Sequence, residues 1–231
     1  MSTQTYPEEG TVWRDPFNKR EVLLDFSHMR SREAFREFYD EDGRKPEMQC
    51  VHYRPTYMRH LLGRLKRSDI LELGSSTGGN LYYLALLGNT VTGVECSRPL
   101  VANFHHFQAQ MPLPMSSRIQ LIEGMIEDLD LPHRFEWILA TEILEHVFDP
   151  VEVLKVGRRH SLPNGKIFIT APEPRWGGSS HVRGVTVADL EEWLPQAGWR
   201  LTEAFVEMAG LGFAEPYRQT VAFAEAVPCE S

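Results

Sequence analysis

Two acidic residues and a run of small residues near position 75 have the types and the spacing that a nucleoside-binding site needs. Glu72 lies in the apolar segment 70–73, and the turn GSSTGG (74–79) follows it. Glu95 ends the next apolar segment, 21 residues after Gly74. Small residues let a ligand approach the backbone, and an acidic residue at about this distance accepts the hydrogen bonds of ribose hydroxyls. The pattern predicts a nucleoside-containing ligand, either a dinucleotide or S-adenosylmethionine.

The carboxylate of Glu72 favours the second ligand. A dinucleotide places its diphosphate over the glycine-rich turn, where a neighbouring carboxylate repels it. S-adenosylmethionine carries a sulfonium and an ammonium instead, and both are attracted to a carboxylate. The alternative role for Glu72 is that of a capping or salt-bridged carboxylate. The turn also lacks the third glycine of GxGxxG, which argues against a dehydrogenase.

The elements that position these residues alternate between strands and helices, which predicts a mostly parallel sheet covered on both faces. Asp149 and Pro150 begin one helix, and Pro163–Gly165 is a turn signal. We expect a Rossmann-like, doubly wound α/β fold with seven strands and a C-terminal antiparallel hairpin. The expected strands are 69–73, 90–95, 118–122, 135–140, 166–171, 200–208 and 219–227, and the expected helices are 80–87, 99–111, 149–160 and 187–197.

The first third of the chain is more polar and reads as an extension of the main domain. We divide the sequence into an N-terminal arm and helical lid, 1–66, and an S-adenosylmethionine-binding domain, 67–231. Helices are expected at 28–40 and 55–65. Their aromatic residues either line an acceptor pocket or pack this layer onto the sheet; they are Phe35, Phe38, Tyr39, Tyr53 and Tyr57.

Several segments resemble, in the right order, the motifs of the class I S-adenosylmethionine-dependent methyltransferases. ILELGSSTGG with VTGVE is similar to the first two motifs, and IEGMIEDLDLP is similar to the loop after the third strand. LATEILEHVFDP, KIFITAPEP and HVRGVTVADLEEWLPQAGW resemble the ubiquinone-biosynthesis-like subgroup (methyltransferase types 11 and 23). The resemblance covers residues 67–227. It implies methyl transfer from S-adenosyl-L-methionine, which leaves S-adenosyl-L-homocysteine.

The resemblance also implies roles for individual residues. Glu95 would bind the ribose, and Met125 and Ile126 would flank the adenine. Thr141 and Glu142 would face the methionine end and the acceptor. The methionine part would lie over Glu72, Gly74, Ser75, Ser76 and Gly78.

Two positions depart from the family pattern. Ser76 stands where the family usually has a second glycine, and its side chain narrows the space above the turn. Met125 stands where an acidic residue usually accepts the adenine amino group. A methionine can only pack there, so the adenine contact is either weaker or taken over by Glu127 or Asp128.

A hydroxyl or amine acceptor must lose a proton, and histidine suits the role of base. We name His181, His146 and Glu142 as catalytic candidates because they follow the fourth and fifth strands of the domain. His52 and His60 could reach the site if the N-terminal layer folds over it, and the pair His105 and His106 is expected to be solvated or in the core. Catalysis by proximity alone would need no base.

Charge and composition limit the partners. The chain has 24 Lys+Arg against 32 Asp+Glu, a net charge of −8, which argues against DNA or long RNA although not against a tRNA-like acceptor. Arg54, Arg175 and Arg183 could pair with an anionic acceptor, or lie on the surface. The three cysteines are widely separated and indicate neither a disulfide framework nor a metal site. With no secretory signal or membrane span in the sequence, we expect a cytoplasmic monomer or homodimer that binds no membrane.

We therefore expect a methyltransferase acting on a small-molecule acceptor, at oxygen more readily than at nitrogen or carbon. The alternatives are a methyltransferase acting on a protein or tRNA, and a non-catalytic module that binds the cofactor. Ser76 and Met125 are the features that favour the non-catalytic reading.

Overall fold

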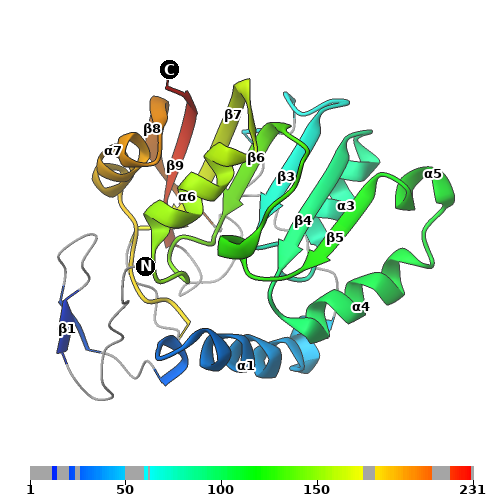
Figure 1. Ribbon diagram of the computed structural model, residues 1–231, viewed down its shortest axis with the longest axis horizontal. Coiled ribbons are helices and arrows are strands. Elements are labelled where there is room, and N and C mark those ends of the chain that lie inside the picture. Colours follow the sequence, from blue (N-terminus) through cyan, green and yellow to red (C-terminus); the bar gives the residue numbers. More distant parts are fainter. Residues whose placement is uncertain are drawn as a thin grey trace.

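The computed structural model describes residues 12–14, 21–23, 27–49, 60–61, 63–173, 180–209 and 219–229. A seven-stranded sheet with the order β5-β4-β3-β6-β7-β9-β8 runs through its centre (Figure 1). Its strands are β3 (Asp69–Leu73), β4 (Thr90–Glu95), β5 (Ile119–Glu123), β6 (Phe135–Thr141), β7 (Ser161–Pro172), β8 (Trp199–Ala209) and β9 (Gln219–Pro228). The first five are parallel, and β9 pairs antiparallel with both β7 and β8. The predicted Rossmann-like sheet with its C-terminal hairpin is confirmed.

Helices cover both faces of the sheet, as a doubly wound fold requires. Successive residues of β6 and β7 point to opposite faces, so Ile138 and Ile167 belong to one apolar core while Leu139 and Phe168 belong to the other. The first core is closed by α6 (Pro150–Arg159) and α7 (Val187–Gln196). The second is closed by α3 (Gly79–Leu86) and α4 (Arg98–Gln108). None of the helices in the described part of the chain has the length and apolar character of a membrane span.

Most of the helix boundaries predicted from capping residues and breaking residues lie within two residues of the observed boundaries. Asp149 caps α6 by accepting the N–H of Glu152, and Pro150 is its first residue. Thr186 and Asp189 form a reciprocal capping box at the start of α7. The short helix α5 (Leu113–Ser116) and the 3-10 turns η1 (Ser27–Met29), η2 (Pro46–Gln49) and η3 (Ile126–Asp128) were not predicted.

The turn predicted at Pro163–Gly165 is wrong, because β7 continues through these residues. The register against β6 shifts there: Phe135 pairs with Ser161, whereas Trp137 pairs with Lys166. The residues that β7 has in excess over β6 between these two pairs form an irregularity within the strand, and the chain does not reverse direction there. In the N-terminal region, β1 (Val12–Arg14) and β2 (Glu21–Leu23) form a small antiparallel sheet that the sequence did not predict. Most of the helix expected at 55–65 lies outside the described residues.

Helix α1 (Arg32–Gly43) lies along the sheet edge toward which the arrowheads of β4 and β5 point (Figure 1). Its main anchor is the buried carboxylate of Asp40, which accepts the backbone N–H of Arg98 at 2.8 Å and the side-chain Nε of Arg98 at 2.6 Å. Ser97 Oγ donates to the carbonyl of Tyr39 at 2.8 Å. Two further ion pairs, Arg32–Asp128 and Arg36–Glu123, tie α1 to the loop after β5 and to the end of β5. Helix α1 thus covers the carboxyl ends of the parallel strands.

Gly93, in the middle of β4, is required by close packing beneath the glycine-rich turn. A Cβ at this position would lie 2.2 Å from Ser75 Oγ and 2.9 Å from both terminal carbons of Leu81. We expect Gly93→Ala to lower the free energy of unfolding by about 1–3 kcal/mol through overpacking, as measured by urea denaturation. Gly63→Ala is the control, because no described residue beyond its chain neighbours lies within 4 Å of its added Cβ. Equal effects of the two variants would contradict this account.

Candidate active site

A cavity of about 320 Å³ opens at the carboxyl ends of β3, β4, β5 and β6, beneath α1. The ends of adjacent parallel strands meet at such an edge, which is where open α/β sheets bind ligands. All of the predicted site residues except Gly78 line the cavity: Glu72, Gly74, Ser75, Ser76, Glu95, Met125, Ile126, Thr141, Glu142, His146 and His181. Their roles remain predictions, but the structure brings these residues together.

The backbone amides of the glycine-rich turn are largely used within the protein. The N–H groups of Gly74 and Ser75 both donate to the carbonyl of Val94 at 3.0 Å, and that of Gly78 donates to Ser75 O at 2.9 Å. The N–H of Ser76 donates to Glu95 Oε2 at 2.8 Å. These four N–H groups are therefore not available to a ligand. A diphosphate would find two carboxylates here instead of a ring of donors, which disfavours a dinucleotide.

Glu72 presents a buried carboxylate to the cavity. Its side chain is 1% exposed, and Oε1 accepts a hydrogen bond from Asn80 Nδ2 at 2.6 Å. Burial raises the pKa of Glu72 to about 7, although the hydrogen bond from Asn80 partly opposes this shift. Its second oxygen, Oε2, is buried without a hydrogen-bond partner of good geometry among the described residues, although Ser75 and Thr141 lie close enough to lower the pKa of the carboxyl. A buried carboxylate of this kind can accept a hydrogen bond from the ammonium of S-adenosylmethionine and attracts its sulfonium by charge.

Glu95 lies at the end of β4, 7% exposed, on the cavity wall. Its two oxygens accept the backbone N–H groups of Ser76 and Ser97, each at 2.8 Å. Burial raises its pKa, and these two backbone hydrogen bonds act in the opposite direction. The bonds fix the plane of the carboxylate and leave lone pairs for a pair of ribose hydroxyls.

Ser76 adopts a left-handed backbone conformation with φ of 48°. This conformation costs roughly 1–2 kcal/mol for a residue with a Cβ, which explains why a glycine suits the position. We expect Ser76→Gly to leave the free energy of unfolding unchanged or raise it by up to about 1 kcal/mol, because relief of strain offsets the greater entropy of glycine in the unfolded chain. Urea denaturation measures this. A loss of more than about 1 kcal/mol would show that the seryl side chain is needed for folding.

The part of the cavity where the resemblance places adenine is lined by Met125, Ile126 and Glu127. The sequence offered Glu127 and Asp128 in place of the acidic residue that the family usually has at position 125. Glu127 lies on the cavity wall, and burial raises its pKa. Asp128 is exposed and pairs with Arg32 of α1 instead. Of these two carboxyl groups, only that of Glu127 lines the cavity.

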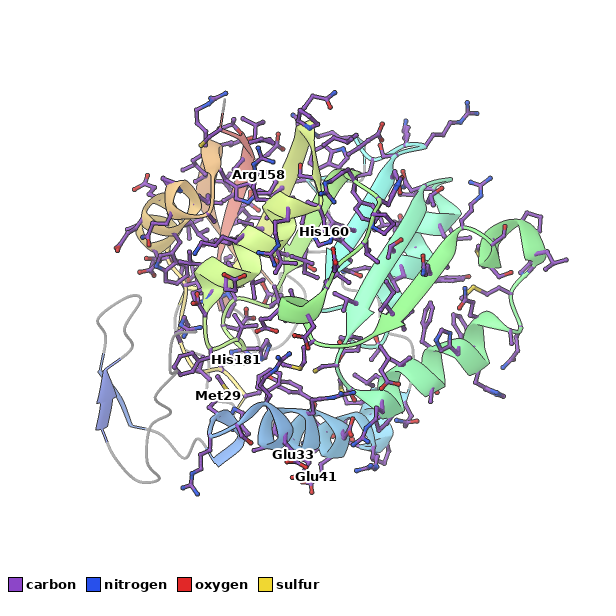
Figure 2. All side chains as sticks on the ribbon, viewed as in Figure 1. Met29, Glu33, Glu41, Arg158, His160 and His181 are labelled. Atoms are coloured by element: carbon purple, nitrogen blue, oxygen red, sulfur yellow. The ribbon has the colours of Figure 1, made fainter. Side chains whose placement is uncertain are left out.

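The end of the cavity where we expect the acceptor, called the acceptor end below, is built by the turn after β6 and by the segment before α7. Glu142 has a left-handed φ of 54°, and strain of this kind is common at functional sites. His146 Nδ1 lies 3.0 Å from the carbonyl of Ser180 and 3.1 Å from the hydroxyl of Tyr39. The rings of His146 and His181 meet edge to face, with their centroids 4.6 Å apart. Figure 2 shows His181 between α1 and the sheet.

Glu145 is the acceptor-end residue that sequence reasoning missed. It is fully buried, and its Oε1 lies 3.7 Å from His146 Nε2. The ligand atoms of Glu145, His146 and His181 all lie within 4.8 Å of one another, so these residues could hold a metal ion as well as move a proton. No metal spacing is visible in the sequence because His181 comes from a different loop. Asn80, which orients Glu72, was also missed, although the start of the helix after a glycine-rich turn is a signal that could have found it.

Other predicted residues lie elsewhere. Gly78 is the N-cap residue of α3, with φ of 76°, and packs against Phe104 instead of lining the cavity. The prediction that His60 could reach the site is wrong. His60 pairs with Glu207 at 3.0 Å and contacts the rings of Phe205 and Phe223 instead.

Among the remaining candidates, His105 and His106 are exposed, as expected. Of the aromatic residues of α1, Phe35 and Tyr39 line the cavity, whereas Phe38 stacks on His28. Arg183 is buried and bound to carbonyl groups, so it is not available to an anionic acceptor. The predictions for His52, Tyr53, Arg54, Tyr57 and Arg175 fall outside the described residues.

The comparisons with known proteins agree with this geometry. Residues 71–169 match the family model described as "Methyltransferase domain". The ubiquinone biosynthesis O-methyltransferase of Coxiella burnetii is 33% identical over 158 residues, which cover 60% of this chain and 66% of that protein. That of Xanthomonas euvesicatoria pv. vesicatoria is 24% identical over 204 residues, covering 78% and 81%. The chain matches about two thirds of the length of several of these relatives.

Solved structures support the fold. The glycopeptide N-methyltransferase MtfA complexed with S-adenosyl-L-methionine has a TM-score of 0.63 and 17% identity, covering 80% of this chain and 99% of that one. The magnesium protoporphyrin IX methyltransferase ChlM from Synechocystis, with bound S-adenosylhomocysteine, has a TM-score of 0.66 and 12% identity, covering 86% and 100%.

The sheet, the turn after its central strand and the two carboxylates define a Rossmann-like nucleoside-binding protein. The matching motifs and relatives narrow this class. The chain belongs to the class I S-adenosylmethionine-dependent methyltransferases.

Proposed function

We propose that this protein transfers the methyl group of S-adenosylmethionine to a small-molecule acceptor, at oxygen rather than at nitrogen or carbon. The observation that carries the proposal is the single cavity that joins the carboxylates Glu72 and Glu95 to the histidines His146 and His181. The oxygen preference is supported by the O-methyltransferase relatives and by a histidine pair that suits deprotonation of a hydroxyl. The small acceptor is supported by α1, which covers the cavity, and by the acidic balance of the chain.

When bound, S-adenosylmethionine supplies a methyl group on a sulfonium that is already a good leaving group. Glu72 would hold the cationic methionine end, and Glu95 would hold the ribose hydroxyls. Fixing both ends restricts the orientation of the methyl group, and alignment of this kind is a large source of rate enhancement. Helix α1 covers part of the cavity, and displacement of water by the bound ligands would strengthen electrostatic interactions within it.

At the other end, His146 and His181 would take the proton of the acceptor hydroxyl. Glu142 and Glu145 lie beside them on the cavity wall and would stabilise the imidazolium that forms. The acceptor would lie between these groups and the aromatic residues Phe35 and Tyr39 of α1, so that its oxygen faces the methionine end along the line of displacement.

Two experiments test the proposal. The first measures binding of S-adenosylmethionine, S-adenosylhomocysteine and NAD by calorimetry, and we expect binding of the first two only. The second incubates the protein with methyl-labelled S-adenosylmethionine and panels of phenols, alcohols, amines, proteins and tRNA. Label in a small hydroxyl compound supports the proposal, whereas label only in a macromolecule, or binding without transfer to any panel, would overturn it.

A further inference from the structure

The connection between β5 and β6 contains the short turn η3 but no α-helix. After η3, which packs against α6, residues 129–134 run to the start of β6 outside any helix or strand. The backbone groups of such a segment must be paired by neighbouring elements. His160, at the end of α6, pairs two of them. Its Nε2 accepts the N–H of Leu131 at 3.1 Å, and its carbonyl accepts the N–H of Phe135 at 2.8 Å.

Two contacts fix the protonation state of the His160 ring, which is only 2% exposed. Nδ1 lies 2.8 Å from the carbonyl of Val156, and a carbonyl oxygen can only accept, so Nδ1 carries a proton. Nε2 receives the N–H of Leu131, so Nε2 carries a lone pair. The ring is therefore the neutral Nδ1–H tautomer, and both of its nitrogens are engaged. Figure 2 shows that His160 lies well away from His181.

The surroundings of this ring disfavour a positive charge on it. Burial lowers the pKa of His160 below its usual value of 6.5, and the guanidinium groups of Arg134 and Arg159 act in the same direction. The hydrogen bond to the Val156 carbonyl and the carboxylate of Asp130 favour the charged form, but they do not cancel the shift. Arg159 comes from α6, and the other two charged groups come from the connection between β5 and β6.

We infer that His160 is an acid-sensitive latch on the connection between β5 and β6. The neutral ring fastens residues 129–134 to α6. A second proton can bind only at Nε2, which would then direct an N–H at the N–H of Leu131, and the hydrogen bond would be lost. The latched segment directly follows η3, whose residues Ile126 and Glu127 lie on the cavity wall. Protonation of His160 therefore loosens the support of this part of the wall.

Hydrogen exchange of the Leu131 amide, followed by NMR on the ligand-free protein, measures the latch directly. The closed segment favours the neutral ring, so the latch is fully effective above the unfolded pKa near 6.5 and is lost as the pH falls through the lower folded pKa. We expect the protection factor to fall by up to about tenfold per pH unit below about 6.5. Glu72 titrates in the same range with the opposite effect on global stability, so a single amide is a sharper probe than denaturation.

His160→Gln and His160→Asn separate the two contacts of the ring. The glutamine oxygen can take the place of Nε2 at every pH, so the Leu131 amide should stay protected down to pH 5. Asparagine reaches only the place of Nδ1. Its variant lacks the acceptor for Leu131, and we expect protection about 2- to 10-fold below that of the wild type at pH 7.5, with no pH dependence.

His133→Gln is the matched control, because His133 belongs to the same connection but is exposed and pairs with Asp69. This variant should keep the wild-type pH dependence. Constant protection of Leu131 between pH 7.5 and 5 in the wild type, a pH dependence that survives in folded His160→Gln, or its loss in His133→Gln would overturn the inference. The wild type and the control suffice if neither His160 variant folds. No measurement needs S-adenosylmethionine or an acceptor, so the result is independent of the proposed function.

Discussion

Glu95→Ala should weaken the binding of S-adenosylmethionine and S-adenosylhomocysteine by a similar factor. Both ligands carry the same ribose, and a hydrogen bond to a charged group contributes about 1.5–3 kcal/mol, so we expect a loss of roughly 10- to 100-fold. The variant also leaves the N–H groups of Ser76 and Ser97 without their carboxylate acceptor, which loosens the turn. Isothermal titration calorimetry measures both affinities.

The matched control is Glu123→Ala. Glu123 ends β5 and is the register partner of Glu95, but its side chain is exposed and pairs with Arg36. An exposed ion pair contributes at most about 1 kcal/mol, so this variant should bind the cofactor nearly as the wild type does. Normal cofactor binding by a folded Glu95→Ala protein would remove Glu95 from the ribose site.

Glu72→Gln should change ligand affinity and stability in opposite directions. The pKa of the buried Glu72 carboxyl is raised to about 7. A raised folded-state pKa means that the fold favours the protonated form, so this group's contribution to stability is fully present below its unfolded pKa near 4.5 and is lost as the pH rises through about 7. Glutamine keeps the neutral shape at every pH. We expect the ligand-free variant to be more stable than the wild type at pH 8 by about 2–3 kcal/mol, measured by urea denaturation, and equally stable near pH 4.5.

The same substitution should remove the pH dependence of cofactor binding. A cationic ligand prefers ionised Glu72, whose pKa in the free protein is about 7. Wild-type affinity should therefore rise with pH between 5.5 and 7.5, by up to about tenfold per pH unit at the acidic end, with a proton released on binding. Glu72→Gln should bind more weakly at pH 7.5 and show a flat profile. Glu136→Gln, at an exposed position of β6, is the control for both measurements. A wild-type profile without pH dependence would show that Glu72 does not face the cation.

Sequence reasoning located the strands and the cofactor end of the site because both depend on local patterns. Short apolar runs bounded by turn residues define the strands, and parallel strands bring their carboxyl ends to one edge. Glu72, Glu95 and Thr141 could therefore be placed together although they are far apart in the chain. The same logic placed His146 near them, since it follows the end of β6.

What could not be predicted depends on contacts between distant segments. Whether the amides of the turn are free is decided by the Val94 carbonyl on the neighbouring strand. Whether Arg183 faces solvent or carbonyls is decided by how two loops pack. The prolines and glycines that end a helix can also be accommodated inside a strand, as Pro163 and Gly165 are in β7. Local composition carries no information about these outcomes.

The strand order has a consequence for how the chain folds during synthesis. β9 lies between β7 and β8, so β8 leaves the ribosome before the only strand that joins it to the rest of the described sheet exists. Until then β8 has two unpaired edges, and Val206 and Met208 remain exposed even in the finished fold. Unpaired strands of this kind readily associate with other chains. β8 therefore stays without its sheet partner, and open to association with other chains, until translation has passed residue 228.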